Sequence, residues 1–253
     1  MRIITFSNNK GGSGKTTTTV SLAACFAERG LRVLVVDLDP QGSATDWLGG
    51  REATVGLIAF SGGGVRVSEI VMASNTPNVD LVPTSPSLVP PGELGGNETG
   101  FAIVRAFAKL PDYWDLVLVD TPPTLGHLSL AALAASNGVV IPVEAHALVL
   151  PGVSSVIASI DRARGHVNPR LELLGIVACR VTTSSHVRDV VTRLRSEFGS
   201  AVLDGTIREA IQIAEAPMAR RPINQHAPRS PVADDYRVVA TELLDRIGDL
   251  QRA

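Results

Sequence analysis

The sequence predicts an α/β fold, a doubly wound and mostly parallel sheet with helices on both faces. Short apolar runs recur along the chain, each bounded by turn residues, as expected for buried parallel strands. Segments with helical periodicity separate these runs, which is the alternation typical of a doubly wound sheet. At 253 residues the chain is long enough to bury a full core in one domain.

The expected elements follow from these runs in order. Strands are predicted at residues 3–6, 33–36, 116–119, 139–143 and 173–178. Helices are predicted at residues 16–28, 129–135, 152–164, 187–198 and 232–249. We expect a single domain over residues 1–253. Residues 49–100 differ, because glycine- and proline-rich stretches interrupt weak helix and strand signals, and we expect them to form an elaboration over one edge of the sheet.

Composition narrows the classes of function. The net charge of -2 gives no overall positive field, so any binding to nucleic acid must use a local basic patch. Cys25 and Cys179 lack metal-site spacing and are predicted to be buried, reduced thiols. The N-terminus lacks a signal-peptide pattern, and no run is apolar enough to span a membrane, so we expect a cytoplasmic protein.

A glycine-rich loop connects the first predicted strand to the first predicted helix. Its sequence, Lys10-Gly11-Gly12-Ser13-Gly14-Lys15-Thr16-Thr17, has what a phosphate chain requires. Glycines let backbone N–H groups approach the anion, and the helix start adds the positive end of its dipole. Lys15 supplies a point charge, and the Thr16 hydroxyl is a predicted Mg²⁺ ligand.

The loop departs from the usual G-x-x-x-x-G-K-[ST] pattern, because Asn9 stands at the first glycine position. It has instead the deviant form K-G-G-x-G-K-[ST], with Lys10 as a second lysine. Only three lysines occur beside twenty arginines, and two of the three lie in this loop. A compact ammonium and a guanidinium are not interchangeable in a narrow phosphate cradle. The loop resembles the signature of the ParA/MinD superfamily of deviant Walker ATPases, a group of P-loop NTPases.

Two further stretches carry the same resemblance. Residues 33–45 are similar to the family's first switch region, which implies that Asp39 orients the attacking water and contributes to catalysis together with Lys10 and Lys15. Asp37 is predicted to be a structural carboxylate at the strand end. Residues 115–123 resemble a Walker B strand, which implies that Asp120 holds Mg²⁺ and that residues 121–126 form a second switch. Asp115 is predicted to cap the start of that strand.

The resemblance continues through residues 140–144 and 215–217 and covers essentially the whole chain. It implies ATP and Mg²⁺ as cofactors. It also implies that adenine is held by Cys179-Arg180 and Thr206-Ile207-Arg208, although Arg180 and Arg208 are equally compatible with solvated charges. Lys10 would reach the phosphates of a second subunit, making a homodimer with ATP between the subunits, a slow ATPase that acts as a switch.

No helix-turn-helix segment precedes the loop, so the resemblance is to the short, Soj-like ParA proteins. This implies nonspecific DNA binding on the nucleoid as the ATP dimer, plasmid or chromosome partition, and a ParB-like or adaptor protein as partner. Residues 161–229 hold 11 arginines and 7 acids. The DNA-binding candidates are Arg188, Arg195, Arg220 and Arg221, with Arg193 weaker because it lies on another flank of its helix. A plain solvated helix face remains the alternative.

Other functions stay open at this stage. A MinD-like membrane switch needs a basic amphipathic C-terminal helix, but residues 241–253 mix acids with arginines and contain no Phe or Trp. Iron–sulfur relatives on the same scaffold need cysteines that contact a cluster, and Cys25 and Cys179 cannot supply them. A similar ATPase can instead position a microcompartment or chemoreceptor cluster. An ATP-dependent ligase of the dethiobiotin synthetase kind is the alternative from another class.

Overall fold

The fold is described by a computed structural model covering residues 1–88, 95–146 and 149–249. Within this part of the chain, the sheet contains β1 (Arg2–Phe6), β2 (Val33–Asp37), β3 (Met72–Ala73), β4 (Val79–Val82), β5 (Leu116–Asp120), β6 (Gly138–Glu144) and β7 (Glu172–Cys179). The strand order is β3-β4-β2-β5-β1-β6-β7, and β3 is the antiparallel member at one edge. The α/β fold with a mostly parallel sheet is therefore confirmed.

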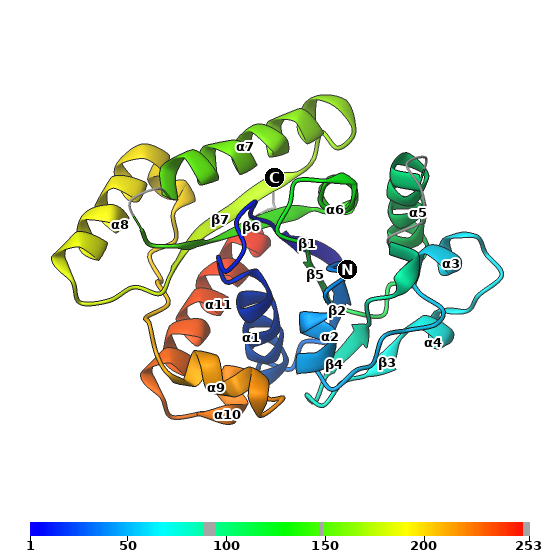
Figure 1. Cartoon of the computed structure of the whole chain (residues 1–253), viewed down its shortest axis with the longest axis horizontal. Helices are drawn as coiled ribbons and strands as arrows, with labels where there is room; N and C mark the ends of the chain where they lie inside the picture. The colour runs from blue at the N-terminus through cyan, green and yellow to red at the C-terminus, as the bar shows by residue number, and fades with distance from the viewer. Residues whose placement is uncertain (89–94, 147–148, 250–253) are drawn as a thin grey trace.

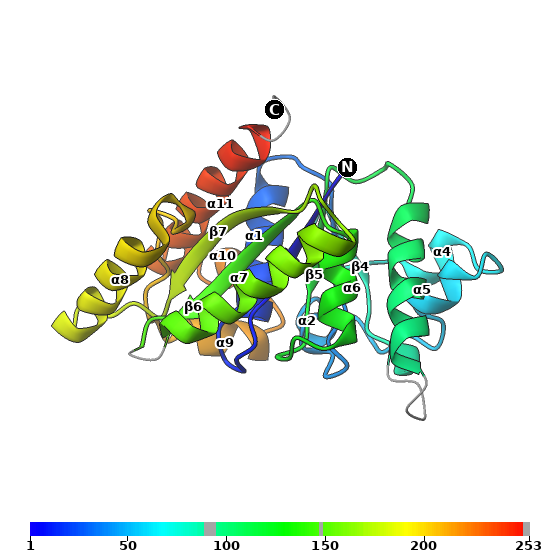
Figure 2. The ribbon, with the colours of Figure 1, turned by 90° about the horizontal axis from the view of Figure 1, so that it is seen from above.

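Helices cover both faces of the sheet (Figures 1 and 2). They are α1 (Lys15–Glu28), α2 (Ser43–Trp47), α3 (Leu57–Ser61), α4 (Val67–Ile70), α5 (Gly95–Lys109), α6 (His127–Ala135), α7 (Val149–His166), α8 (Ser185–Phe198), α9 (Gln212–Met218), α10 (Ile223–His226) and α11 (Pro231–Asp249). Short 3-10 turns lie at Pro86–Leu88 and Gly199–Ala201. The five predicted helices and five predicted strands are all present, with ends that differ by at most three residues.

Alternating strand residues build a separate core on each face of the sheet. One face, with Phe6 and Val140, packs against α1, α9, α10 and α11. The opposite face packs against α3 to α6 beside β2 and β5, and against α7 and α8 beside β6 and β7. Successive strand side chains point to opposite faces, so one buried strand contributes to both cores.

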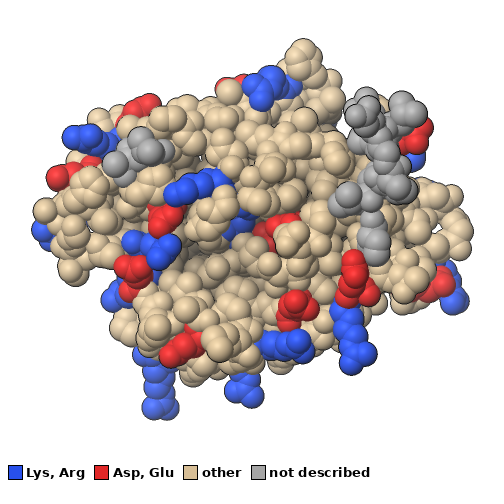
Figure 3. All heavy atoms as spheres, in the orientation of Figure 1, with Lys and Arg blue, Asp and Glu red and all other residues tan. Residues whose placement is uncertain are grey.

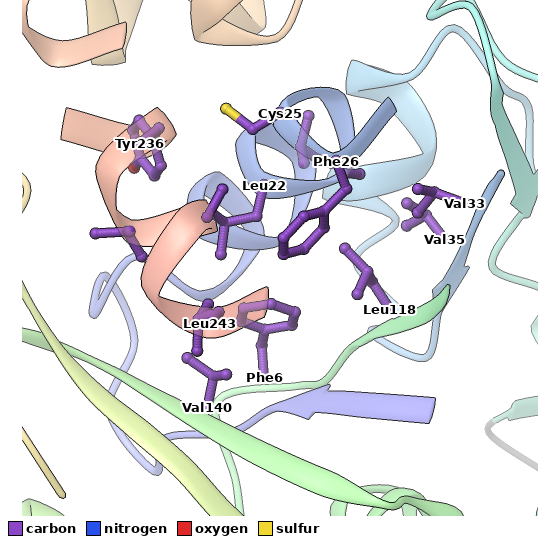
Figure 4. Close-up of a cluster of buried hydrophobic side chains, with 14 of the residues drawn as sticks. Phe6, Leu22, Cys25, Phe26, Val33, Val35, Leu118, Val140, Tyr236 and Leu243 are labelled. Atoms are coloured by element: carbon purple, nitrogen blue, oxygen red, sulfur yellow. The ribbon is translucent and has the colours of Figure 1, made fainter. Parts of the chain in front are cut away.

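Helix α1 is central to the first core, and its residues 18–27, which are all apolar or small, are all buried. Phe26 is fully buried, which stabilises the fold by about 1.5–3 kcal/mol relative to an exposed side chain. Figure 4 shows the α1 side chains meeting those of the long helix α11, and the residues drawn from the two helices include Leu22, Cys25, Phe26, Tyr236 and Leu243. Cys25 and Cys179 are both buried and unpaired, as predicted.

Residues 49–88 contain two strands that the sequence pattern did not locate, β3 and β4. β4 pairs in parallel with β2 and extends the main sheet, and α3 and α4 follow α2 on the way to it. Residues 89–94 of the predicted elaboration and residues 250–253 of the C-terminal segment lie outside the described part of the chain. Among the described residues, no helix is both long and apolar enough to cross a membrane.

Candidate functional site

The glycine-rich loop lies where the strands β1, β2 and β5 end together. Asp120 pairs in register with Phe6 and with Asp37, so these three strand ends are level. Gly12 and Gly14 have φ angles of 76° and 91°, in the left-handed region that glycine adopts without strain. Gly14 directly precedes α1, so the loop delivers backbone N–H groups and a helix N-terminus to one point. This is an anion-binding arrangement.

The two lysines of the loop point to different places. Lys15 is 6% exposed, and its Nζ donates to the Lys10 carbonyl at 3.3 Å, across the loop. Burial lowers the pKa of Lys15, whereas the nearby Asp120 and Asp39 raise it in opposition. Lys15 is therefore a desolvated cation inside the loop.

Lys10 instead lies at the surface, with its side chain 51% exposed. Its Nζ is 3.2 Å from Glu144 Oε2, at the end of β6, and 2.6 Å from His146 Nε2, two residues further on. Glu144 in turn accepts from Arg180 at 2.9 Å. The ammonium of Lys10 is thus held outside its own phosphate loop by a network of exposed ion pairs.

Asp120 is fully buried at the end of β5. Its Oδ2 accepts from the Thr16 hydroxyl at 2.6 Å, and its Oδ1 is buried with no hydrogen-bond partner among the described residues. Burial, and then the proximity of Asp37, raises the pKa of Asp120 to about 8, against the opposing effect of Thr16 and Lys15. The Ser13 hydroxyl is also buried without a partner in the described chain. Unsatisfied buried oxygens beside a phosphate loop fit a hard divalent cation such as Mg²⁺, which prefers oxygen ligands.

Asp37 is also buried but is fully engaged by the protein. Its Oδ2 accepts from the backbone N–H and the hydroxyl of Thr45 at 2.8 and 2.7 Å, and its Oδ1 accepts from the Asp39 N–H at 3.1 Å. Burial raises the pKa of Asp37 to about 6, and the Thr45 hydrogen bonds oppose that shift. This bonding supports a structural role for Asp37.

Asp39 begins a tight turn with Pro40, Gln41 and Gly42. The Asp39 carbonyl accepts from the Gly42 N–H at 2.9 Å, and Oδ1 accepts from the Gln41 N–H at 3.0 Å. Aspartate first, proline second and glycine fourth is the composition that a type I turn favours. Oδ1 is engaged by the turn, and among the described residues no hydrogen bond reaches Oδ2. One carboxylate oxygen therefore stays available for a ligand or a water.

A cavity of about 580 Å³ opens beside the loop. Figure 3 shows this face hollowed near its middle, with basic and acidic side chains around the hollow. Its walls combine the loop with β7, the segment after it and α11, and its lining residues are Gly12, Gly14, Thr17, Cys179, Arg180, Ile207, Glu209, Ala210, Ile211, Ile213, Ala214 and Tyr236. An apolar cavity continuous with a phosphate loop suits a nucleotide base.

Known proteins are similar in sequence to nearly the whole of this chain. The AAA_31 family model, described as an AAA domain, matches residues 1–173. The chain is 41% identical over 249 residues to the chromosome-partitioning ATPase Soj of Thermus thermophilus, covering 98% of this chain and 97% of that protein. It is 32% identical to the sporulation initiation inhibitor protein Soj of Bacillus subtilis, covering 96% of this chain and 98% of the relative. The chain belongs to the ParA/Soj/MinD family of deviant Walker ATPases.

Solved structures agree with this assignment. A Mycobacterium smegmatis protein described as cobyrinic acid a,c-diamide synthase, with bound ADP and magnesium, is 30% identical and superposes with a TM-score of 0.82 over 98% of this chain and 96% of that one. The cell division ATPase MinD of Pyrococcus furiosus, at 23% identity, superposes with a TM-score of 0.77 over 96% and 98% and shows the shared fold. The resemblance inferred from the loop and the predicted ATPase class are confirmed.

In this ParA/Soj-like ATPase, the predicted base-binding residues divide into two groups. Ile207 and Arg180 line the cavity, and Arg180 has a left-handed φ of 55° while pairing with Glu144 and Glu209. Arg208 is not among the lining residues. Its guanidinium donates to both oxygens of Asp235 at 2.7 and 2.8 Å, which directs it to α11.

Sequence reasoning missed most of the apolar cavity wall. Residues 209–214 carry no charge pattern or motif that distinguishes a base pocket from an ordinary helix start. Tyr236 was predicted only as part of the last helix. Its side chain is fully buried among α1 residues while still reaching the cavity, a contact that no single segment reveals.

The DNA-binding candidates of this ATPase do not form one patch within a protomer. Arg188 and Arg195 lie on α8, whose buried stripe includes Val190 and Leu194 and packs on the α7 side of the sheet. Arg220 and Arg221 follow α9, which packs with α1 and α11 on the other face. Their backbone carbonyls accept from Asn75 and from Trp47 respectively. The four candidate arginines therefore divide between helices on opposite faces of the sheet.

Proposed function

We propose that this ATPase binds Mg-ATP, dimerises around the bound nucleotide and then binds DNA nonspecifically to segregate a chromosome or plasmid. The observation that carries the proposal is the separation of the two loop lysines. Lys15 is buried in its own phosphate loop, whereas Lys10 is half exposed and held outside it. A surface lysine at this position is available to a second copy of the chain.

The roles of the chain's own residues follow from their surroundings. The loop N–H groups, the α1 N-terminus and Lys15 bind and orient the triphosphate. Thr16 and Asp120 would hold Mg²⁺, which when bound neutralises charge on the phosphate oxygens. Asp39 orients the attacking water through the carboxylate oxygen that its turn leaves available. Ile207, Tyr236 and residues 209–211, which precede α9 and are called the α9 approach, exclude water around the base.

Dimerisation turns this slow ATPase into a switch. ATP contacts contributed by Lys10 of a second subunit exist only in the dimer, so the nucleotide favours that state by its differential contacts, and hydrolysis removes them. The dimer would present each arginine group twice, a basis for phosphate contacts without base reading. A ParB-like or adaptor protein would stimulate turnover, with the ATP form on the nucleoid in the cytoplasm. The partitioning name of the Thermus relative supports the cargo being DNA.

The proposal is tested by measuring the mass of the purified protein in solution with and without a nonhydrolysable ATP analogue and Mg²⁺. Wild type should shift from monomer to dimer. Lys10→Ala should bind the analogue and remain monomeric, because it loses only the contact across the interface. Lys15→Ala should lose nucleotide affinity itself. A wild-type protein that stays monomeric at saturation, or a Lys10→Ala protein that dimerises normally, contradicts the proposal.

A second candidate function is ATP-dependent amidation or ligation of a small acid, favoured by the 30% identity to the Mycobacterium smegmatis synthase. The two functions differ in which molecules stimulate the conversion of ATP to ADP. Nonspecific DNA with a partner protein should stimulate a partition ATPase. Cobyrinic acid with an amide donor should stimulate a synthase, and such stimulation with no response to DNA would favour the second candidate.

A further inference from the structure

Thr84, two residues after the end of β4, is joined to the first switch by two hydrogen bonds. Its side chain is buried, with 4% of the residue exposed. Its Oγ1 donates to the Asp39 carbonyl at 2.9 Å, and its backbone N–H donates to Thr45 Oγ1 at 2.9 Å. Thr84 lies outside the glycine-rich loop, the first switch and the Walker B strand.

These bonds close a ring through the site. Thr84 binds Thr45, Thr45 binds Asp37 through both its N–H and its hydroxyl, and Asp37 accepts from the N–H of Asp39. The ring returns to Thr84 at the Asp39 carbonyl. Both backbone polar groups of Asp39 are thereby fixed, one on each side of the residue. A buried network with its members satisfied is rigid, and it specifies one arrangement.

The methyl group of Thr84 also restricts the turn that follows Asp39. Gly42 has a φ of 68°, and a Cβ built on it would lie 2.9 Å from Thr84 Cγ2. On its other side, the Thr84 carbonyl accepts from the Ala53 N–H at 2.9 Å. Thr84 therefore connects the turn that begins at Asp39 to Ala53, in the segment that follows α2.

We propose that Thr84 is a positioning residue for ATP hydrolysis, holding the Asp39 backbone so that the free carboxylate oxygen meets the attacking water. The proposal rests on the catalytic role proposed above for Asp39. A displacement of about 1 Å in an orienting group costs on the order of 10²-fold in rate. The Thr84 hydroxyl, distant in sequence from the switch, thus raises kcat. It does not contribute to nucleotide binding, which depends on other residues.

The test compares a variant that loses the Thr84 hydroxyl with one that keeps it. Thr84→Val keeps the branched shape and the backbone N–H but loses Oγ1, and Thr84→Ser keeps the hydroxyl. We expect Thr84→Val to lower kcat about tenfold, the effect of losing one buried hydrogen bond. Its KM and its affinity for the nonhydrolysable analogue should stay within about twofold of wild type. Thr84→Ser should recover most of the lost rate.

Two further variants are the controls. Thr76→Val removes another buried hydroxyl, the one that donates to Asn75 Oδ1 in the loop between β3 and β4, and it should leave kcat unchanged. Asp39→Ala should bind ATP and fail to hydrolyse it. Thermal melts and circular dichroism on each variant establish that the fold is intact. If Thr84→Val melts below the assay temperature, Thr84→Ala assayed at a lower temperature provides a second variant without the hydroxyl.

The outcomes separate this proposal from the one it rests on. An inactive Asp39→Ala together with a Thr84→Val of wild-type kcat overturns the positioning role alone. A Thr84→Val defect that appears equally in Thr84→Ser and in Thr76→Val indicates general loosening and also overturns it. Undiminished turnover by Asp39→Ala removes the proposed role of Asp39 and the positioning role together.

Discussion

At the scale of single residues, two carboxylates at neighbouring strand ends differ because of what contacts them. Asp37 receives hydrogen bonds from Thr45 and Asp39 that satisfy both its oxygens, and Asp120 keeps one buried oxygen without a partner in the described chain. The sequence predicts both positions, since each ends a buried apolar run. Only the structure reveals the partners, because Thr45 and Thr84 are ordinary threonines in the sequence. The assignments of Asp39, Asp120 and the loop residues to catalysis and binding stay predictions.

Substitution of Asp120 tests whether this proposed Mg²⁺ ligand lowers the stability of the metal-free fold. Burial raises its pKa to about 8, well above that of an unfolded aspartate. The folded state therefore binds more protons between about pH 4 and 8, and this group lowers the stability of the metal-free fold as pH rises through that range. Asp120→Asn should melt higher than wild type at pH 8 without nucleotide or Mg²⁺, and the gain should shrink towards pH 4.

Thermal melts in chelator at both pH values measure this difference. A parallel titration should show that Asp120→Asn has lost the Mg²⁺ dependence of nucleotide binding. A melting temperature that falls at pH 8 would mean that the buried charge stabilises the apo fold.

At the scale of secondary-structure elements, the sequence predicts the strands that contain at least four consecutive uncharged and mainly apolar residues. The strands β1, β2, β5, β6 and β7 all have such runs. β4 has only four residues and carries Asp80, whose Oδ2 accepts from Trp114 Nε1 at 2.8 Å. An acid inside a short run interrupts the apolar pattern that predicts a strand. The hydrogen-bond partner that satisfies Asp80, Trp114, lies 34 residues away in the sequence. The cavity wall around the start of α9 was missed for the related reason that its residues have no periodic pattern.

The arginines of α8 give a prediction at this scale. Arg195 Nη2 donates to the Asp204 carbonyl at 3.0 Å, which occupies part of its guanidinium, while Arg188 lies exposed on the same helix. Arg188→Ala should therefore weaken DNA binding of the ATP-bound protein more than Arg195→Ala does. The slope of log affinity against log salt is negative, and each lost phosphate contact should reduce its magnitude by about 0.9.

Arg193→Ala is the matched control, because Arg193 is an exposed arginine on another flank of α8 and should have a small effect. The paired substitution of Arg220 and Arg221 tests the other face of the sheet. Equal losses from Arg188→Ala and Arg193→Ala would indicate a general charge effect. Loss only from the Arg220 and Arg221 pair would move the DNA surface to the α9–α10 turn.

At the scale of the whole molecule, segments from the N-terminal and C-terminal parts of the chain meet at the glycine-rich loop. β1 and α1 supply the phosphate loop, and β7, the α9 approach and α11 supply the cavity wall. The rim between them is an ion-pair network in which Glu144 binds both Lys10 and Arg180, and Arg180 also binds Glu209. The single protomer thus holds Lys10 in contacts that a dimer would have to exchange for phosphate contacts.

This exchange predicts that weakening the hold on Lys10 favours the dimer. An exposed ion pair contributes about 0.2–1 kcal/mol, and a dimer forms from two protomers that each give up one such pair, so removing the pair should raise the dimerisation constant by up to about 30-fold. Glu144→Gln should therefore dimerise at a lower concentration of protein with the nonhydrolysable analogue than wild type. Glu209→Gln is the matched control, because it removes the other ion pair of Arg180 at 3.1 Å without touching Lys10. Sedimentation across a protein dilution series measures both equilibria. A weaker dimer in Glu144→Gln would mean that Glu144 contributes to the interface itself, and an equal shift in Glu209→Gln would trace the effect to Arg180.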